Sequence, residues 1–106
     1  MQQVDTRDEI EEQIKQNELL LLYFTGTACG ACEVIKHKVE MILEKYPEVK
    51  GIEVNGEQFP QVAMSYGVYA LPLMILFVQG KESIREGRNL NLLEFEEKVA
   101  RYVSML

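Results

Sequence analysis

The chain has two cysteines, Cys29 and Cys32, which are three positions apart and are the residues best suited to do chemistry. A disulfide between them closes a small loop and stabilises a fold only weakly, because the entropic gain from a cross-link grows with loop length. The spacing therefore favours a reactive thiol pair. Two other interpretations stay open: two inert structural thiols, and a zinc or iron–sulfur site completed by another chain. Such a site needs four ligands. A monomer offers only the two cysteines and His37, its single histidine, so it lacks at least one ligand.

The segments on either side of the pair indicate how it is positioned. A continuous apolar run over residues 19–24 predicts a buried strand, which the turn-forming residues 25–27 end. A helical pattern over residues 31–46 follows the pair, and Pro47 stops it. Cys29 then lies at a helix N-terminus, where free N–H groups and the helix dipole stabilise a thiolate. We expect Cys29 to attack a substrate disulfide and Cys32, one turn later, to resolve the mixed disulfide.

The rest of the chain supplies the elements of an α/β domain. Three more helices are predicted, over residues 6–16, 59–66 and from 91 onward. Three more strands are predicted, over residues 51–54, 73–78 and 82–86. Helices and strands alternate up to residue 67, which implies parallel crossovers, and Gln79-Gly80 then predicts an antiparallel hairpin. The expected fold is a central mixed sheet flanked by helices, in a single domain over residues 1–106.

Some core positions can be predicted from the same periodicity. Both Met64 and Met74 are expected in the core, and His37, between lysines, on the surface. The inner face of the last helix is expected to comprise Leu92, Phe95, Val99, Tyr102 and Leu106.

Charge and composition exclude several classes of partner. Eleven Lys and Arg residues stand against seventeen Asp and Glu, and a net charge of −6 argues against binding nucleic acid or an anionic membrane. No apolar run approaches the length needed to span a bilayer. The N-terminal segment lacks the basic start and apolar stretch of a signal peptide, so a cytoplasmic location is expected.

Beyond the cysteine pair, motifs along nearly the whole chain resemble those of the thioredoxin family. They are Tyr23-Phe24 at the end of an apolar strand, Cys29-Gly30-Ala31-Cys32, Tyr66-Gly67-Val68, Leu71-Pro72, Phe77 followed by Gln79-Gly80, and Gly87. The resemblance implies a thioredoxin-like fold and an oxidoreductase that reduces protein disulfides. It further implies a monomer without bound organic cofactor or metal, re-reduced by a thioredoxin reductase-type flavoprotein that draws on NADPH.

The same resemblance assigns a substrate site. Pro72 matches the cis-proline that lies beside the two sulfurs in the family, and the backbone of Leu71 would pair with an incoming peptide strand. The other residues assigned are Ala28 and Gly87, which would line the groove, and Gly30 and Ala31, which would tune the redox potential.

Three positions depart from the family pattern. The usual tryptophan before the first cysteine is Ala28, which should weaken or broaden substrate contact. Ala31 replaces the usual proline between the cysteines and should make the pair less strongly reducing. Tyr23 stands in place of the buried acid that helps deprotonate the resolving cysteine, and a tyrosine with a reference pKa near 10 is a poor base. Glu53 is a candidate substitute.

Two other functions stay open. The missing tryptophan and Tyr23 would suit a weakly active or redox-inactive binding module that holds a partner in the groove at Pro72, although the intact cysteine pair opposes this. A glutaredoxin-like role with glutathione as electron donor is disfavoured, because Leu71 replaces the usual polar residue before the cis-proline.

Overall fold

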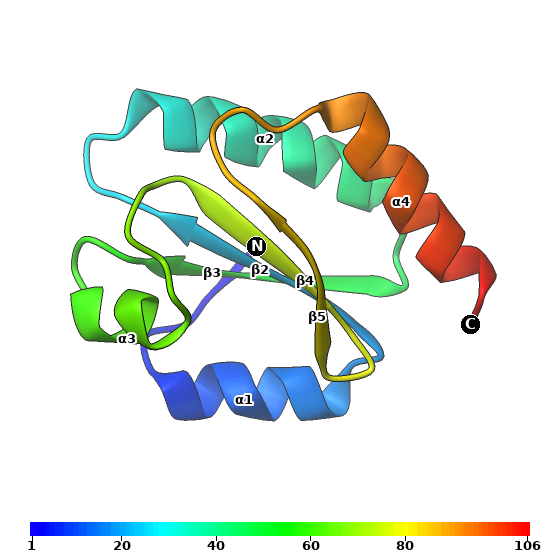
Figure 1. The fold of residues 1–106 in the computed structure, drawn as a ribbon, viewed down its shortest axis with the longest axis horizontal. Helices are drawn as coiled ribbons and strands as arrows, with labels where there is room; N and C mark the ends of the chain where they lie inside the picture. The colour runs from blue at the N-terminus through cyan, green and yellow to red at the C-terminus, as the bar shows by residue number, and fades with distance from the viewer.

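The computed structural model describes residues 1–106 as a five-stranded sheet with helices on both faces (Figure 1). The strands are β1 (Gln2–Gln3), β2 (Leu19–Thr25), β3 (Val49–Asn55), β4 (Leu73–Val78) and β5 (Lys81–Glu86). The helices are α1 (Arg7–Gln16), α2 (Gly30–Glu44), α3 (Pro60–Ser65) and α4 (Leu92–Ser104). The sheet is mixed and the helices flank it, which confirms the predicted fold class.

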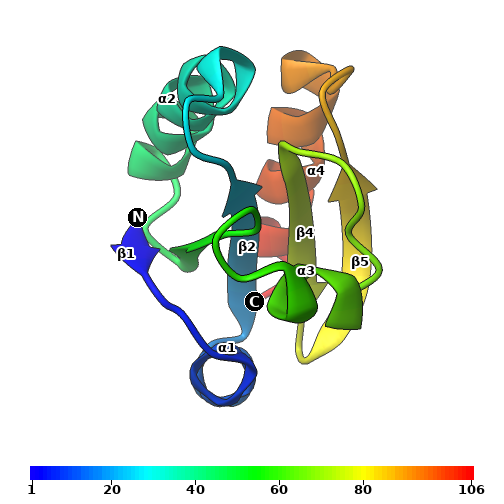
Figure 2. The ribbon, with the colours of Figure 1, turned by 90° about the vertical axis from the view of Figure 1, so that its left-hand side faces the viewer.

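The strand order is β1-β3-β2-β4-β5, with β2 in the middle (Figure 2). Strands β1, β3 and β2 run parallel, whereas β4 is antiparallel to both β2 and β5. The crossovers and the closing hairpin therefore agree with the sequence. Strand β1 was not predicted from the sequence. Its two residues are exposed and show no hydrophobic pattern, and they form a strand only because they pair with Ile52 and Glu53.

Strand β2 is buried along its whole length because both faces of the sheet are covered. Its even-numbered apolar residues, Leu20, Leu22 and Phe24, join the core cluster that includes α1 and α3. Its odd-numbered residues join the cluster that includes α2 and α4, and Tyr23 is the last of these. The carboxyl end of β2 is therefore fixed in the core, and the short loop from Gly26 to Cys29 joins it to the start of α2.

Helix starts agree closely with the sequence. Thr6 caps α1 by accepting a hydrogen bond from the Glu9 N–H at 3.2 Å, and Asn91 caps α4 by accepting one from the Glu94 N–H at 3.1 Å. Gly67, at φ +72°, follows the short helix α3. No helix combines the length and apolarity required to cross a membrane.

Two predicted core residues are exposed. Met64 is 48% exposed, because α3 has only six residues and buries Ala63 alone. Leu106 is 54% exposed, because α4 ends at Ser104 and its apolar stripe is not continued. Met74 is buried and His37 is exposed, as predicted.

Candidate active site

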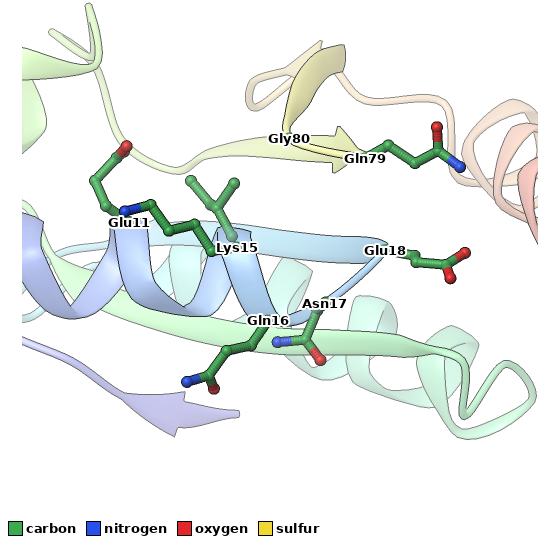
Figure 3. Close-up of a pocket in the computed structure, with 8 residues that line it drawn as sticks. Glu11, Lys15, Gln16, Asn17, Glu18, Gln79 and Gly80 are labelled. Carbon is green, nitrogen blue, oxygen red and sulfur yellow. The ribbon is translucent and has the colours of Figure 1, made fainter.

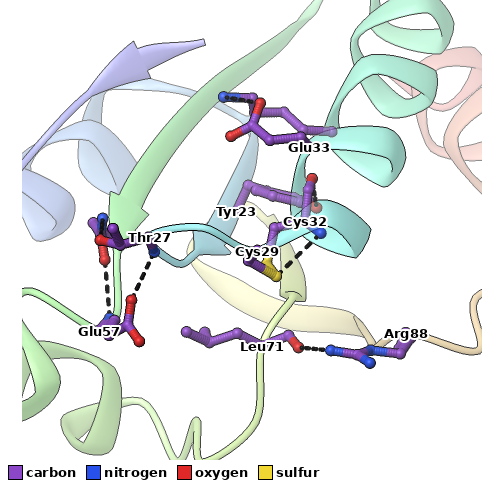
Figure 4. Close-up of a disulfide and its surroundings, with 10 residues drawn as sticks. Tyr23, Thr27, Cys29, Cys32, Glu33, Glu57, Leu71 and Arg88 are labelled. Carbon is purple, nitrogen blue, oxygen red and sulfur yellow. Dashed lines mark hydrogen bonds and ion pairs between the residues drawn. A yellow bond between two sulfur atoms is a disulfide. The ribbon is translucent and has the colours of Figure 1, made fainter.

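The cysteine pair lies where the loop after β2 enters helix α2 (Figure 4). Cys29 is the N-cap of α2, and its Sγ accepts a hydrogen bond from the backbone N–H of Cys32 at 3.2 Å. The two residues form a disulfide with their Cα atoms 5.2 Å apart. Cys29 is partly exposed, whereas Cys32 is fully buried. A substrate can therefore reach only the first sulfur directly, and the second lies behind it.

The loop before the cysteines is held by Asn55, the last residue of β3, and by Glu57, which follows the strand. The carboxylate of Glu57 accepts a hydrogen bond from the Thr27 N–H at 2.8 Å, and the Asn55 side-chain amide donates to the Thr27 hydroxyl at 3.1 Å. Ala28 is exposed and has a left-handed backbone, with φ at +49°. The two strand ends thus fix the conformation of the loop that carries Cys29.

Gly26 lies where Leu71 packs closely against this loop. A Cβ at this position would lie 3.1 Å from Cδ1 of Leu71 and 3.6 Å from Cβ of Cys29. The fold therefore brings Leu71 and Cys29, which are far apart in the sequence, against the same glycine. By contrast, Gly30 and Ala31 form the first turn of α2, and a Cβ on Gly30 would meet nothing within 4 Å, which leaves that side open.

The Leu71–Pro72 peptide bond is cis, as the resemblance implies. Pro72 is buried, and it lines a narrow crevice together with Tyr23 and Ile35. Gly87 packs against it: a Cβ on Gly87 would be 3.8 Å from the Pro72 carbonyl oxygen. Pro72 and Gly87 therefore lie together at the crevice that Tyr23 also lines.

Tyr23 lies next to the start of α2, where it contacts Cys32. Its ring is fully buried, and its hydroxyl donates a hydrogen bond to the Cys32 carbonyl oxygen at 2.7 Å. Burial raises the pKa of Tyr23 well above its ordinary value, and the negative charges of Glu33, Glu53 and Glu40 raise it further. Tyr23 therefore stays protonated at neutral pH and acts as a hydrogen-bond donor.

Glu53 lies beside Tyr23, on the face of the sheet that α2 covers. The two residues are register partners on β3 and β2, and Lys36 of α2 reaches Glu53 at 3.1 Å. Burial alone would lower the pKa of Lys36, but its hydrogen bond to Glu53 and the charges of Glu53 and Glu33 raise it overall. The alternation of β3 left the face of Glu53 undecided. In the structure Glu53 lies on the face of the sheet that α2 covers, where its carboxylate forms an ion pair with Lys36.

Two tyrosines, Tyr23, which is buried, and Tyr66, which is partly buried, give an alkaline pH dependence. Burial raises the pKa of Tyr23, and burial together with Glu11 raises that of Tyr66, whereas both ionise near pH 10 in the unfolded chain. Above about pH 10 the unfolded state binds fewer protons, so the free energy of unfolding should fall by up to about 1.4 kcal/mol per pH unit for each tyrosine. Below that pH this stabilisation is fully present. Urea unfolding between pH 9 and pH 11 measures the slope.

Tyr23→Phe is the matched variant for this measurement. It should lose about 1 kcal/mol at neutral pH with the hydroxyl hydrogen bond, and its alkaline slope should be shallower than that of the original protein. Parallel slopes in the two proteins would mean that the Tyr23 hydroxyl does not contribute to the alkaline loss.

Two residues at this site were missed by sequence reasoning. Glu57 lies in the turn after β3, the strand next to β2, a position at which a polar residue could have been considered. Arg88 follows Gly87, and its Nη2 donates a hydrogen bond to the Leu71 carbonyl oxygen at 2.9 Å. No group of three or more His, Cys, Asp or Glu side chains is placed to hold a metal ion.

A second surface depression lies at the opposite end of β2 (Figure 3). It is lined by Glu11, Ile14, Lys15, Gln16, Asn17, Glu18, Gln79 and Gly80. Most of the residues that line the depression are polar, and it holds neither cysteine. The reactive groups of the chain are therefore concentrated at the cysteine end of the sheet.

Comparison with known proteins agrees with this geometry. A family model described as Thioredoxin matches residues 2–101. Thioredoxin-1 of Saccharomyces cerevisiae is 32% identical over 76% of this chain and 78% of its own, and a thioredoxin-like protein of Bacillus subtilis is 28% identical over 87% and 82%. The X-ray structure of Fasciola hepatica thioredoxin has a TM-score of 0.84 and 30% identity, and the match covers 96% of this chain and 99% of that one. The chain therefore belongs to the thioredoxin family and, with the Cys29–Cys32 pair in place, is a thiol–disulfide oxidoreductase.

Proposed function

We propose that the protein reduces disulfide bonds in other proteins, with Cys29 as the attacking and Cys32 as the resolving residue. The observation that carries this proposal is the unequal placement of the two sulfurs. Cys29 is partly exposed, and its Sγ receives the Cys32 N–H at the start of α2, whereas Cys32 is fully buried. In the reduced state the same N–H and the helix dipole would stabilise a Cys29 thiolate, which is the nucleophile in disulfide exchange.

The reaction consists of two exchanges. The Cys29 thiolate attacks one sulfur of the substrate disulfide, which forms a mixed disulfide and releases the other sulfur as a thiolate that takes up a proton. Cys32 then loses its proton and attacks Sγ of Cys29, and the second substrate sulfur leaves as a thiol. The substrate gains two electrons and two protons, and the protein is left with the Cys29–Cys32 disulfide. A flavoprotein reductase that draws on NADPH would return both electrons.

The groove for the substrate would lie along Leu71 and Pro72. Pro72 has no N–H, so an extended peptide would pair with the backbone of Leu71. Ala28 and Gly87 would line this groove, and their small side chains leave it shallow. The dipeptide Gly30-Ala31 in the first turn of α2 would tune the potential of the pair. We expect this chemistry in a monomer in the cytoplasm, where protein disulfides are normally kept reduced.

Reduction of insulin disulfides tests the function. With NADPH and a thioredoxin reductase, the protein should reduce insulin well above the rate of dithiothreitol alone, and a variant with both cysteines changed to serine should not. Equilibration of the Cys29–Cys32 pair with glutathione buffers gives the potential, which decides between reductant and oxidant. A rate no higher than the dithiothreitol background would instead favour a binding module that keeps the fold without the activity.

A further inference from the structure

Arg88 is an unpaired cation at the edge of the proposed groove. It is exposed, it follows Gly87, and its Nη2 donates to the Leu71 carbonyl oxygen at 2.9 Å (Figure 4). Arg85, three residues earlier on β5, is already paired with Glu82 at 2.9 Å. Arg88 takes part in none of the ion pairs of the structure. Its charge is therefore held beside a backbone group that a substrate would use.

We propose that Arg88 forms a carboxylate-binding subsite, so that the protein prefers disulfides with an aspartate or glutamate close by in the sequence. The inference rests on the proposed function. A guanidinium has five N–H donors, and one of those of Arg88 is used, so others are free for a carboxylate. The Leu71 carbonyl has a second lone pair for a peptide N–H. Peptide pairing at Leu71 and carboxylate binding at Arg88 are therefore compatible.

The opposite side of the groove carries negative charge. A Cβ on Gly26 would lie 3.6 Å from Cβ of Cys29 and 3.9 Å from Oε2 of Glu57, so this carboxylate is close to the attacking cysteine. In Figure 4, Glu57 and Arg88 lie on opposite sides of Leu71. A peptide whose acidic residue lies at Arg88 is attracted, whereas the reversed charge order places that residue at Glu57 and is repelled. The site should therefore select the order as well as the sign of charge.

The net negative charge of the protein disfavours acidic substrates. The effect of Arg88 on acidic substrates has the opposite sign and can therefore be measured separately. The net charge of −6 repels any anionic peptide at long range. At an ionic strength near 0.15 M charges more than about 8 Å apart are largely screened, and a direct guanidinium–carboxylate contact survives. A preference for acidic peptides at this salt concentration therefore requires a nearby cation, and Arg88 lies at the edge of the proposed groove, hydrogen-bonded to the Leu71 carbonyl oxygen.

The test uses disulfide-bonded peptides that differ only in one residue beside the reactive cysteine. That residue is Asp, Asn or Lys, placed before the cysteine in one set and after it in the other. At 0.15 M salt, kcat/KM should be about threefold to fivefold higher for Asp than for Asn in one of the two sets, as expected for a partly exposed ion pair. Arg88→Gln should abolish this ratio, Arg88→Lys should retain part of it, and Arg88→Glu should favour the Lys peptide instead.

Arg101→Gln is the matched control. Arg101 is an exposed residue on α4, and its replacement changes the net charge by the same amount as Arg88→Gln. The ratio between Asp and Asn peptides should be unchanged in this variant. Equal kcat/KM for all peptides, or an Asp preference that persists in Arg88→Gln, would overturn the proposed subsite while the reductase function stands. A failure to reduce any peptide would overturn the proposed function itself.

Discussion

Replacing Cys29 with serine is expected to lower insulin reduction by at least about 1,000-fold, to the background rate, because a serine hydroxyl cannot form the mixed disulfide. Cys32→Ser should also stop turnover, but at a later step. Its Cys29 remains partly exposed at the start of α2 and can still attack. The mixed disulfide then persists, because the resolving sulfur is missing. Intact-mass spectrometry after mixing with a disulfide substrate should show the added substrate mass.

The two single variants are each other's controls in this experiment. Cys29→Ser should trap no substrate, because the remaining sulfur of Cys32 is fully buried. The reverse result, with a stable adduct in Cys29→Ser and none in Cys32→Ser, would exchange the attacking and resolving roles. It would also mean that the buried cysteine becomes accessible on reduction. Adducts of equal yield in both variants would contradict the division of roles.

Tyr23→Asp is expected to accelerate the resolving step by about tenfold, because it puts a proton acceptor beneath Cys32. The Tyr23 ring is fully buried and its hydroxyl reaches the Cys32 carbonyl oxygen at 2.7 Å. Burial and the neighbouring Glu53 would raise the pKa of a carboxyl group at this position, which suits a base at neutral pH. Loss of the aromatic ring should cost about 3–5 kcal/mol of stability. Decay of the mixed disulfide in single-turnover experiments measures the rate, and urea unfolding measures the stability.

Tyr23→Asn separates the base from the cavity. Asparagine has nearly the shape of aspartate and leaves the same space, but it accepts no proton near neutral pH. It should therefore lose comparable stability without the gain in rate. If both variants resolved the mixed disulfide equally fast, water entering the cavity would account for the change. An unchanged rate in Tyr23→Asp would show that proton removal from Cys32 does not limit turnover in this protein.

Local patterns explain why so much of the site could be predicted. All seven residues of β2 are buried because both faces of the strand are covered, and six of them, Leu19 to Phe24, form a continuous apolar run that a turn ends. The next helix begins at Gly30, so the local pattern places Cys29 at its N-cap, and Asn55 and Glu57 then hold the loop that precedes it. Strand period, turn and helix start all act over a few residues. They suffice to place the two sulfurs at the end of the central strand.

Other features depended on contacts between distant parts of the chain. The face of Glu53 could not be decided from β3 alone; its pairing with Tyr23 on β2 and its contact with Lys36, 17 residues away, show that it points toward α2. Likewise β1 exists through pairing with β3, and the apolar Met64 is exposed because α3 is short. Periodicity describes which residues share a face. It does not say which partner that face meets.

The sequence by itself determined the chemistry of this protein: two thiols, one at a helix start and one a turn later, behind a buried strand. The tertiary structure decided what surrounds them. Thr27 meets Glu57 across 30 residues, and Leu71 meets Arg88 across 17. Each of these contacts joins loops at the same end of the strands. The packing of whole strands, rather than any local pattern, sets the distance between these loops.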